Sequence, residues 1–187
     1  MRKKTATGST DQKIGDFWKS GMDSVGIDKA GLSPLQNDRN DINNISSNAQ
    51  LLKVGSALHK KGVSAFFNAY VAQDDKNSEV MAFKMDQGGL GLPNRDYYFN
   101  TDDRTDKIRT AYKEYMRKTF SQLDSNVGNA QKNTNDVFAL ETRLAKSSRK
   151  LADLRDPYKN YNKMNLAGLS KKASNIDWNA YTKNIGI

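Results

Sequence analysis

The sequence predicts a mainly α-helical domain that contains one long antiparallel helix hairpin and one small antiparallel strand pair. Three observations support this fold class. Apolar residues recur at spacings of three and four along most of the chain, which is the pattern of a helix with one buried face. Residues 64–85 are instead rich in aromatic and β-branched residues, which are typical of strands. Hydrophobic residues make up 36% and charged residues 27% of the chain, as expected when helices bury narrow apolar stripes.

Length and residue usage limit the organisation of the chain. Its 187 residues suffice for one domain with a real core, and we expect residues 1–9 to form a loose polar tail and residues 10–187 the helical domain. The chain has no cysteine, which excludes a disulfide framework, a thiol nucleophile and a cysteine-bound metal. No apolar run approaches the ~20 residues of a membrane span. The basic start at residues 1–4 is not followed by the apolar stretch of a signal peptide.

Several helices are predicted before residue 63. Ser33 and Pro34 suit the cap and first residue of one helix, and a later helix begins after Ser47 and ends near Gly62. The first helix has Thr10 as its predicted N-cap and an apolar line on one face, formed by Ile14, Phe17, Trp18, Met22 and Val25.

The aromatic region predicts two strands, at residues 64–71 and 80–85. Residues 73–78 between them are rich in turn formers, so we expect an antiparallel pair with a long polar connection. Two strands alone are marginally stable in water. The pair therefore needs helices packed against it or further strands from outside this chain.

Two long helices are predicted after residue 101, capped by Thr101 or Asp102 and separated by a break at residues 124–128. So short a break should join them into an antiparallel hairpin. The predicted inner line of the first helix is Ile108, Tyr112, Tyr115, Thr119 and Leu123, with Met116 and Phe120 beside it. That of the second is Ala130, Thr134, Val137, Leu140, Leu144 and Ala145. Asn165 and Asp177 suit the caps of two short final helices.

A loop rich in glycine, residues 87–98, lies between the strands and the long helices. It lacks the third glycine of a dinucleotide-binding fingerprint and the lysine of a phosphate-binding loop, so it predicts architecture rather than nucleotide binding. We expect Leu90 and Leu92 to be buried and the glycines to have positive φ or close contacts. We expect Arg95 and Asp96 to be tied to the backbone or to each other.

Few residues offer catalytic chemistry. His59 is the only histidine, so a helix-borne zinc site with two histidines is excluded, and a Ser-His-Asp triad would require other groups to converge on it. A structural or surface role for His59 is the simpler interpretation. The pairs at residues 74–75 and 102–103 are carboxylates without calcium-loop spacing, which favours turns or helix caps over metal binding.

Two Arg-Asp pairs adjoin proline-bearing turns: Arg95 with Asp96, and Arg155 with Asp156. Each pair could form a buried ion pair that holds its loop, and either could point at a ligand carboxylate. The first interpretation is favoured because of the neighbouring prolines.

The net charge of +9 leaves two interpretations open. One is an acidic partner such as nucleic acid or an acidic protein, bound by a non-catalytic basic helical module. The other, which we favour, is a solvated helical exterior, because the cations are scattered and no recognised nucleic-acid motif is present.

Several stretches resemble the neprilysin family of zinc metalloendopeptidases, which includes endothelin-converting enzyme and bacterial oligopeptidase O. The most specific is residues 86–98, Asp-Gln-Gly-Gly-Leu-Gly-Leu-Pro-Asn-Arg-Asp-Tyr-Tyr, preceded by residues 73–78. Residues 140–145, 155–164 and 176–181 follow in the family's order. The residues of this family motif, to which we assign a structural role, are Gly88, Gly89, Leu90, Gly91, Leu92, Pro93, Arg95, Asp96, Tyr97, Tyr98, Arg155, Asp156 and Pro157.

The resemblance implies that the chain is the N-terminal helical cap of a longer enzyme. In the family this cap encloses a cavity that admits peptides and excludes folded proteins. The family's zinc-binding and catalytic residues lie in a C-terminal domain, and none maps onto this sequence. The resemblance therefore implies zinc in the parent enzyme but none bound by this chain, no activity of the chain alone, the missing catalytic domain as its partner, and a location outside the cytoplasm.

Overall fold

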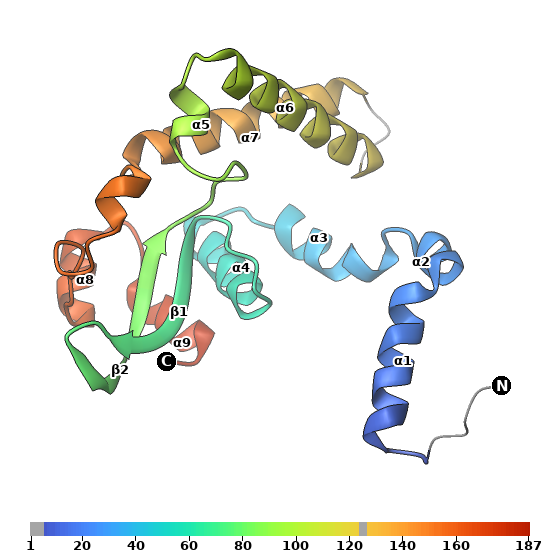
Figure 1. Cartoon of the computed structure of the whole chain (residues 1–187), viewed down its shortest axis with the longest axis horizontal. Coiled ribbons are helices and arrows are strands. Elements are labelled where there is room, and N and C mark those ends of the chain that lie inside the picture. Colours follow the sequence, from blue (N-terminus) through green and yellow to red (C-terminus); the bar gives the residue numbers. More distant parts are fainter. Residues whose placement is uncertain (1–5, 124–126) are drawn as a thin grey trace. The chain divides into compact units, whose positions relative to one another are not determined.

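The computed structural model describes residues 6–123 and 127–187, which form parts of two compact units, Met1–Asn44 and Ile45–Ile187. We call these unit 1 and unit 2 and describe each by itself. The first five residues of the predicted tail and residues 124–126 of the predicted helix break lie outside the described residues. The predicted mainly α-helical class with one strand pair is confirmed (Figure 1).

Unit 1 consists of short helices: α1 (Thr10–Met22), α2 (Ser24–Ala30), the 3-10 turn η1 (Ser33–Leu35) and α3 (Gln36–Asn43). Ser9, not Thr10, caps α1, because its hydroxyl accepts a hydrogen bond from the backbone of Gln12 at 3.2 Å. The helix predicted to reach Val25 is interrupted at Asp23, whose carboxylate caps α2 by accepting from Gly26 at 3.0 Å. The apolar residues predicted on one face of α1 are exposed.

The strands of unit 2 are β1 (Phe67–Asp74) and β2 (Asn77–Gln87), paired antiparallel from Phe67 opposite Gln87. The long polar connection predicted between them is wrong, because the turn is only residues 75–76. Within the polar stretch 73–78, Gln73 pairs with Met81 and Asp74 pairs with Asn77. The Asp74 carboxylate stabilises the turn by accepting a hydrogen bond from the backbone of Lys76 at 2.9 Å.

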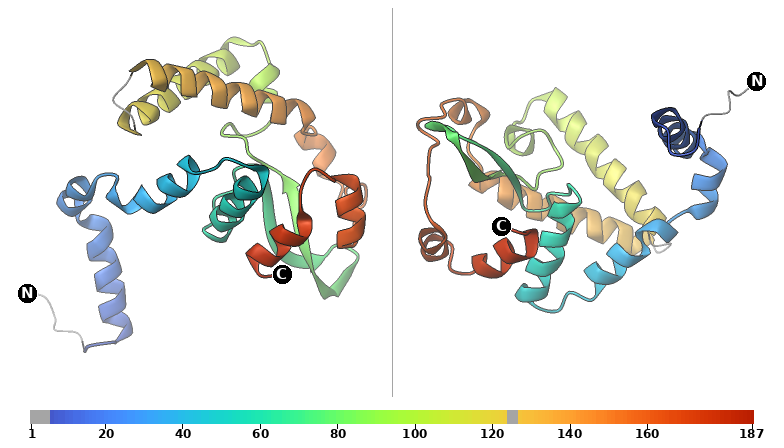
Figure 2. Two further views of the ribbon diagram at one scale, coloured as in Figure 1. Left: turned by 180° about the vertical axis from the view of Figure 1, so that it is seen from behind. Right: turned by 90° about the horizontal axis from the view of Figure 1, so that it is seen from below.

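Helices cover one face of this hairpin, as the marginal stability of two strands requires. They are α4 (Asn48–Lys60), capped by Ser47, and α9 (Trp178–Ile185), capped by Asp177. The ring of Phe67 on β1 lies 4.9 Å from that of His59 and 5.5 Å from that of Tyr181, measured between centroids. Figure 2 shows α4 and α9 next to the strands.

The long helices α6 (Asp103–Leu123) and α7 (Val127–Ser147) pack along each other as predicted, and Asp102 caps α6 by accepting from Thr105 at 3.0 Å (Figure 1). The predicted inner lines need two corrections. On α6, Tyr115 is 65% exposed and its neighbour Met116 is buried. On α7, Leu140 is exposed and Glu141 is buried. The predicted line of α7 is otherwise correct, because Ala130, Thr134 and Ala145 are buried.

The remaining elements connect the strand hairpin and its covering helices to the helix hairpin of α6 and α7. They are the short helix α5 (Asp96–Phe99), the 3-10 turn η2 (Leu151–Leu154) and α8 (Leu166–Lys172). Asn165 caps α8 as predicted, accepting from Gly168 at 2.8 Å. No helix in the described ranges is both long enough and apolar enough to cross a membrane.

Candidate functional site

The glycine-rich loop packs into the helix hairpin. Leu92 and Tyr98 are buried together with Ala145 of α7, and Leu90, Tyr97, Ile108, Tyr112 and Phe138 pack around them. Leu92 is thus buried as predicted, whereas Leu90 is half-buried. The loop forms part of the core of unit 2.

Close contacts explain the glycines of this loop. Gly89 has φ of +74°, which favours glycine. A Cβ on Gly91 would lie 1.8 Å from the hydroxyl oxygen of Tyr112, and one on Gly88 would lie 2.9 Å from the backbone nitrogen of Asn68. The expectation of positive φ or close contacts is confirmed at these positions.

Glu141 is the polar centre of the loop. Its carboxylate accepts hydrogen bonds from the Gly91 backbone at 3.2 Å, from the Tyr112 hydroxyl at 2.9 Å and from the Tyr98 hydroxyl at 2.9 Å. The Tyr98 hydroxyl in turn accepts from the backbone of Leu92 at 3.1 Å. Burial, reinforced by Glu141, raises the pKa of both tyrosines. A carboxylate satisfied by three donors fixes the loop to both long helices.

Arg95 and Asp96 hold the end of the loop. The Arg95 guanidinium donates to the carbonyl of Ala145 at 3.3 Å and lies 3.7 Å from the Asp96 carboxylate. The expected tie to the backbone and to each other is confirmed. Pro93 is exposed, and the carbonyl of Tyr97 accepts from Arg109 at 2.9 Å.

The second Arg-Asp pair is built differently. The Asp156 carboxylate accepts from the backbones of Tyr158 and Lys159, at 3.0 and 3.1 Å. Arg155 and Pro157 are exposed, and Arg155 makes no ion pair with any described residue. The buried pair expected here is therefore not formed, because Asp156 is occupied by the turn itself.

A groove of about 680 Å³ runs beside β2. Its first wall is the unbroken run of residues 80–86, and its second wall is residues 160–166 with Leu169 of α8. Trp178 and Ile187 also line it. Because successive strand residues point to opposite faces, lining by an unbroken run places the groove along the edge of the strand.

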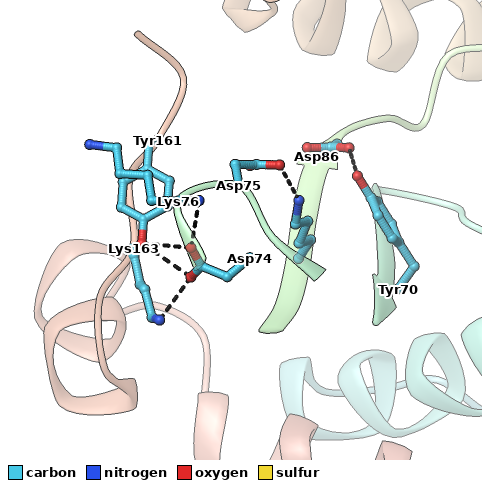
Figure 3. A network of polar contacts seen from close by, with 8 residues as sticks. Tyr70, Asp74, Asp75, Lys76, Asp86, Tyr161 and Lys163 are labelled. Carbon is cyan, nitrogen blue, oxygen red and sulfur yellow. Dashed lines mark hydrogen bonds and ion pairs between the residues drawn. The ribbon is translucent and has the colours of Figure 1, made fainter. Parts of the chain in front are cut away.

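A polar network joins the hairpin turn to the second wall of this groove (Figure 3). The side chain of Asp74, only 2% exposed, accepts from Lys163 Nζ at 2.8 Å and from the Tyr161 hydroxyl at 3.0 Å. The hydrogen bond from Lys163, followed by that from the Lys76 backbone, lowers the pKa of Asp74 to about 2. The network therefore anchors residues 161–163 to the end of β1.

Two further contacts cross the exposed face of the hairpin (Figure 3). Lys84 donates to Asp75 at 2.6 Å, and the Tyr70 hydroxyl donates to Asp86 at 2.7 Å. The bond to Asp86 raises the pKa of Tyr70 to about 12. The acidic residues at the groove thus already have donors.

His59 has a structural environment. Its Nδ1 lies 2.7 Å from the Tyr181 hydroxyl, so the imidazole links α4 to α9 across 122 residues of sequence. Burial lowers the pKa of His59. No serine or carboxylate contact to the ring is present among the described residues, and the interpretation of a structural histidine is supported.

The described part of the chain groups no set of side chains that fits a zinc ion. The described ranges hold no group of three or more His, Cys, Asp or Glu side chains placed to share a metal ion. Asp102 is used as a helix cap and Asp74 as the centre of the polar network.

Sequence reasoning missed three residues of these clusters. Glu141 lies four residues before Ala145 on the buried face of α7, and a lone carboxylate on an apolar line is a signal that could have identified it. Tyr161 and Lys163 lie 87 and 89 residues from Asp74, and no local pattern connects them.

Comparisons with known proteins agree with the resemblance found in the sequence. The family model described as peptidase family M13 matches residues 1–187. Neprilysin-3 of Drosophila melanogaster is 36% identical over 128 residues, which are 68% of this chain and 16% of that protein. Endothelin-converting enzyme-like 1 of Mus musculus is 29% identical over 184 residues, which are 91% of this chain and 24% of that protein.

Solved structures give the same result. The Mycobacterium tuberculosis zinc metalloprotease Zmp1 in complex with an inhibitor matches with a TM-score of 0.89 and 27% identity, over 97% of this chain and 28% of that one. Its open state matches with a TM-score of 0.88. The chain thus spans between 16% and 28% of the length of these relatives. Because the family model covers every residue, the chain belongs to peptidase family M13.

Proposed function

We propose that this chain is the N-terminal, substrate-gating part of a zinc-dependent metalloendopeptidase and has no peptidase activity alone. One observation carries the proposal: a chain that matches the family over its whole length spans at most 28% of the relatives named above. The proposed partner is the remaining, catalytic part of the enzyme, and the proposed substrates are peptides.

The residue types of this chain support the proposal that catalysis belongs to the other part of the enzyme. With a single histidine in the chain and no metal-ligand group in its described part, the zinc would be held by residues outside this chain. In the parent enzyme the metal would polarise the peptide carbonyl. The contribution of this chain would be shape: a core pinned by Glu141 and Arg95 gives a firm wall that limits access to the reaction.

A peptidase assay tests the proposal. The purified chain is incubated with zinc and an internally quenched fluorogenic peptide, and no zinc-dependent rise in fluorescence is expected. The His59→Ala variant serves as a control for the only imidazole. Zinc-dependent turnover that survives this substitution would overturn the proposal. The expectation that the protein works outside the cytoplasm stays a prediction.

A second candidate function, binding of an acidic macromolecule, is favoured by one observation. Residues 143–172 contain nine basic and two acidic residues; the basic ones are Arg143, Lys146, Arg149, Lys150, Arg155, Lys159, Lys163, Lys171 and Lys172. A gel shift with duplex DNA at increasing salt tests it, since real phosphate contacts give a steep loss of affinity with salt. Absence of a shift at low salt would remove this candidate.

A further inference from the structure

The strand edge along the groove has free backbone groups. In the described chain β2 pairs only with β1, and residues 78–86 make no backbone hydrogen bond to any element outside the hairpin. Residues 162–164 of the opposite wall likewise make no hydrogen bond between backbones to the described residues. An open edge of this kind is a template for one more extended strand.

The side chains along the groove are suited to variable apolar groups. Met81, Met85 and Met164 line it, which is half of the six methionines in the chain. Met81 is 60% and Met164 41% exposed. Flexible, polarisable thioethers adapt to different partners and are common on surfaces that accept many ligands.

Charge indicates the kind of occupant. The groove lining holds three carboxylates and two lysines, and both lysines are already paired, Lys163 with Asp74 and Lys84 with Asp75. The carboxylates of Asp75 and Asp86 at the groove already have donors. The net charge of +9 opposes a second copy of the chain, and a lining whose lysines are already paired favours a peptide without charged side chains.

We propose that the groove binds an extended peptide that adds a strand to the edge of β2. Apolar side chains at alternate positions of the peptide contact the methionines, and its backbone pairs with the edge of β2. The proposal depends on the proposed function in one respect: the cap of a peptidase is exposed to peptides, which would supply the ligand. The proposal assigns to this chain a peptide-binding site in addition to the role of a wall that limits access.

Fluorescence polarisation with the chain of 187 residues tests the proposal. The probe is a capped, fluorescein-labelled peptide of alternating valine and threonine. Saturable binding below about 1 mM is expected. The control probe has the same residues but N-methyl groups on alternate backbone nitrogens on its β2-facing side, and it should bind at least about 10-fold more weakly. Equal binding of both probes, or no saturable binding, would overturn the proposal.

A matched pair of variants locates the site. Met81→Glu places a negative charge in the groove and should weaken binding about 10-fold or more. Val71→Glu changes an apolar residue of similar exposure, 57%, on β1 outside the groove lining, and should bind as the unaltered chain does. Circular dichroism checks both folds. If Met81→Glu does not fold, the comparison of the two probes on the unaltered chain still tests whether the peptide binds as an added strand.

Two further outcomes would assign the groove to another occupant. A dimer in sedimentation that Met81→Glu dissociates would assign it to a second copy. Loss of peptide binding in a longer form of the protein would assign it to the protein's own downstream segment. Mass spectrometry of the recovered peptide distinguishes failure of this proposal from failure of the proposed function. A peptide that binds and is also cleaved would contradict the proposed inactivity of the chain but not the proposed binding site.

Discussion

The described residues of unit 2 include two buried carboxylates, which are stabilised in different ways. Glu141 has only neutral donors, two tyrosine hydroxyls and one backbone amide, and all come from the core around the glycine-rich loop. Asp74 has a cation, Lys163, whose side chain is 52% exposed at the groove. In the first network Glu141 and Tyr98 are buried in the core, whereas the second includes a lysine side chain that reaches solvent. The core around the glycine-rich loop is thus held by buried hydrogen bonds, whereas the groove beside β2 has space for a ligand.

The largest effect is expected at Glu141. Glu141→Ala removes the acceptor of three donors, of which the Tyr98 hydroxyl is buried, so the free energy of unfolding should fall by about 3–5 kcal/mol, measured by urea denaturation. Asp136→Ala is the control on the same helix, since Asp136 makes only an exposed ion pair with Lys132 and should cost less than about 1 kcal/mol. Similar losses for both variants would contradict the central role of Glu141.

Gly91→Ala should cost somewhat less, about 2–3 kcal/mol. The added methyl group collides with the hydroxyl of Tyr112 and displaces it from Glu141. Gly15→Ala in α1 is the control, because its Cβ meets no atom within 4 Å and alanine favours helix. Thermal unfolding distinguishes them: the first variant should melt lower and the second at the same temperature or higher.

Asp74→Asn should destabilise the chain in a way that depends on pH. The folded pKa of Asp74, about 2, lies below its ordinary value of 3.8. The contribution of this carboxylate is therefore complete above about pH 4 and is lost as the pH falls through about 2. Urea midpoints of the variant and the unaltered chain should differ at neutral pH and converge in acid. A constant difference over this range would show that the charge of Asp74 does not contribute.

A smaller effect of pH on stability is expected at His59, which packs between α4, α9 and the strand hairpin. The folded pKa of His59 is lowered below 6.5, so its contribution to stability is complete above about pH 6.5 and declines as the pH falls below that value. Because His59 is the only histidine, its NMR titration gives the folded pKa directly. A pKa at or above the ordinary value would contradict burial between α4 and α9.

Local chemistry made much of the fold predictable. Ser47, Asn165 and Asp177 cap helices as their side chains and positions indicate, because an N-cap is decided within three residues. On α6 the prediction was wrong at Tyr115, because Tyr115 and Met116 are both apolar and only the packing partner decides which of them is buried.

Long-range contacts could not be predicted. The turn at residues 75–76 was missed because a polar stretch can continue a strand when backbone pairing supports it. The bond from Lys163 to Asp74 spans 89 residues, so no spacing rule reveals it. The family motif located the loop, but its dependence on Glu141 required the structure.

The link between His59 and Tyr181 also sets an order of events during synthesis. The helices α6 and α7 are neighbours in sequence and can dock as soon as both have been made. The strands are made earlier, but α9, which covers their aromatic face, follows about a hundred residues later and must close a long loop. The nascent hairpin can pack on α4, which is made before it, but it lacks the cover of α9 until residues 178–185 are made, and this interval is when the chain is most vulnerable to misassembly.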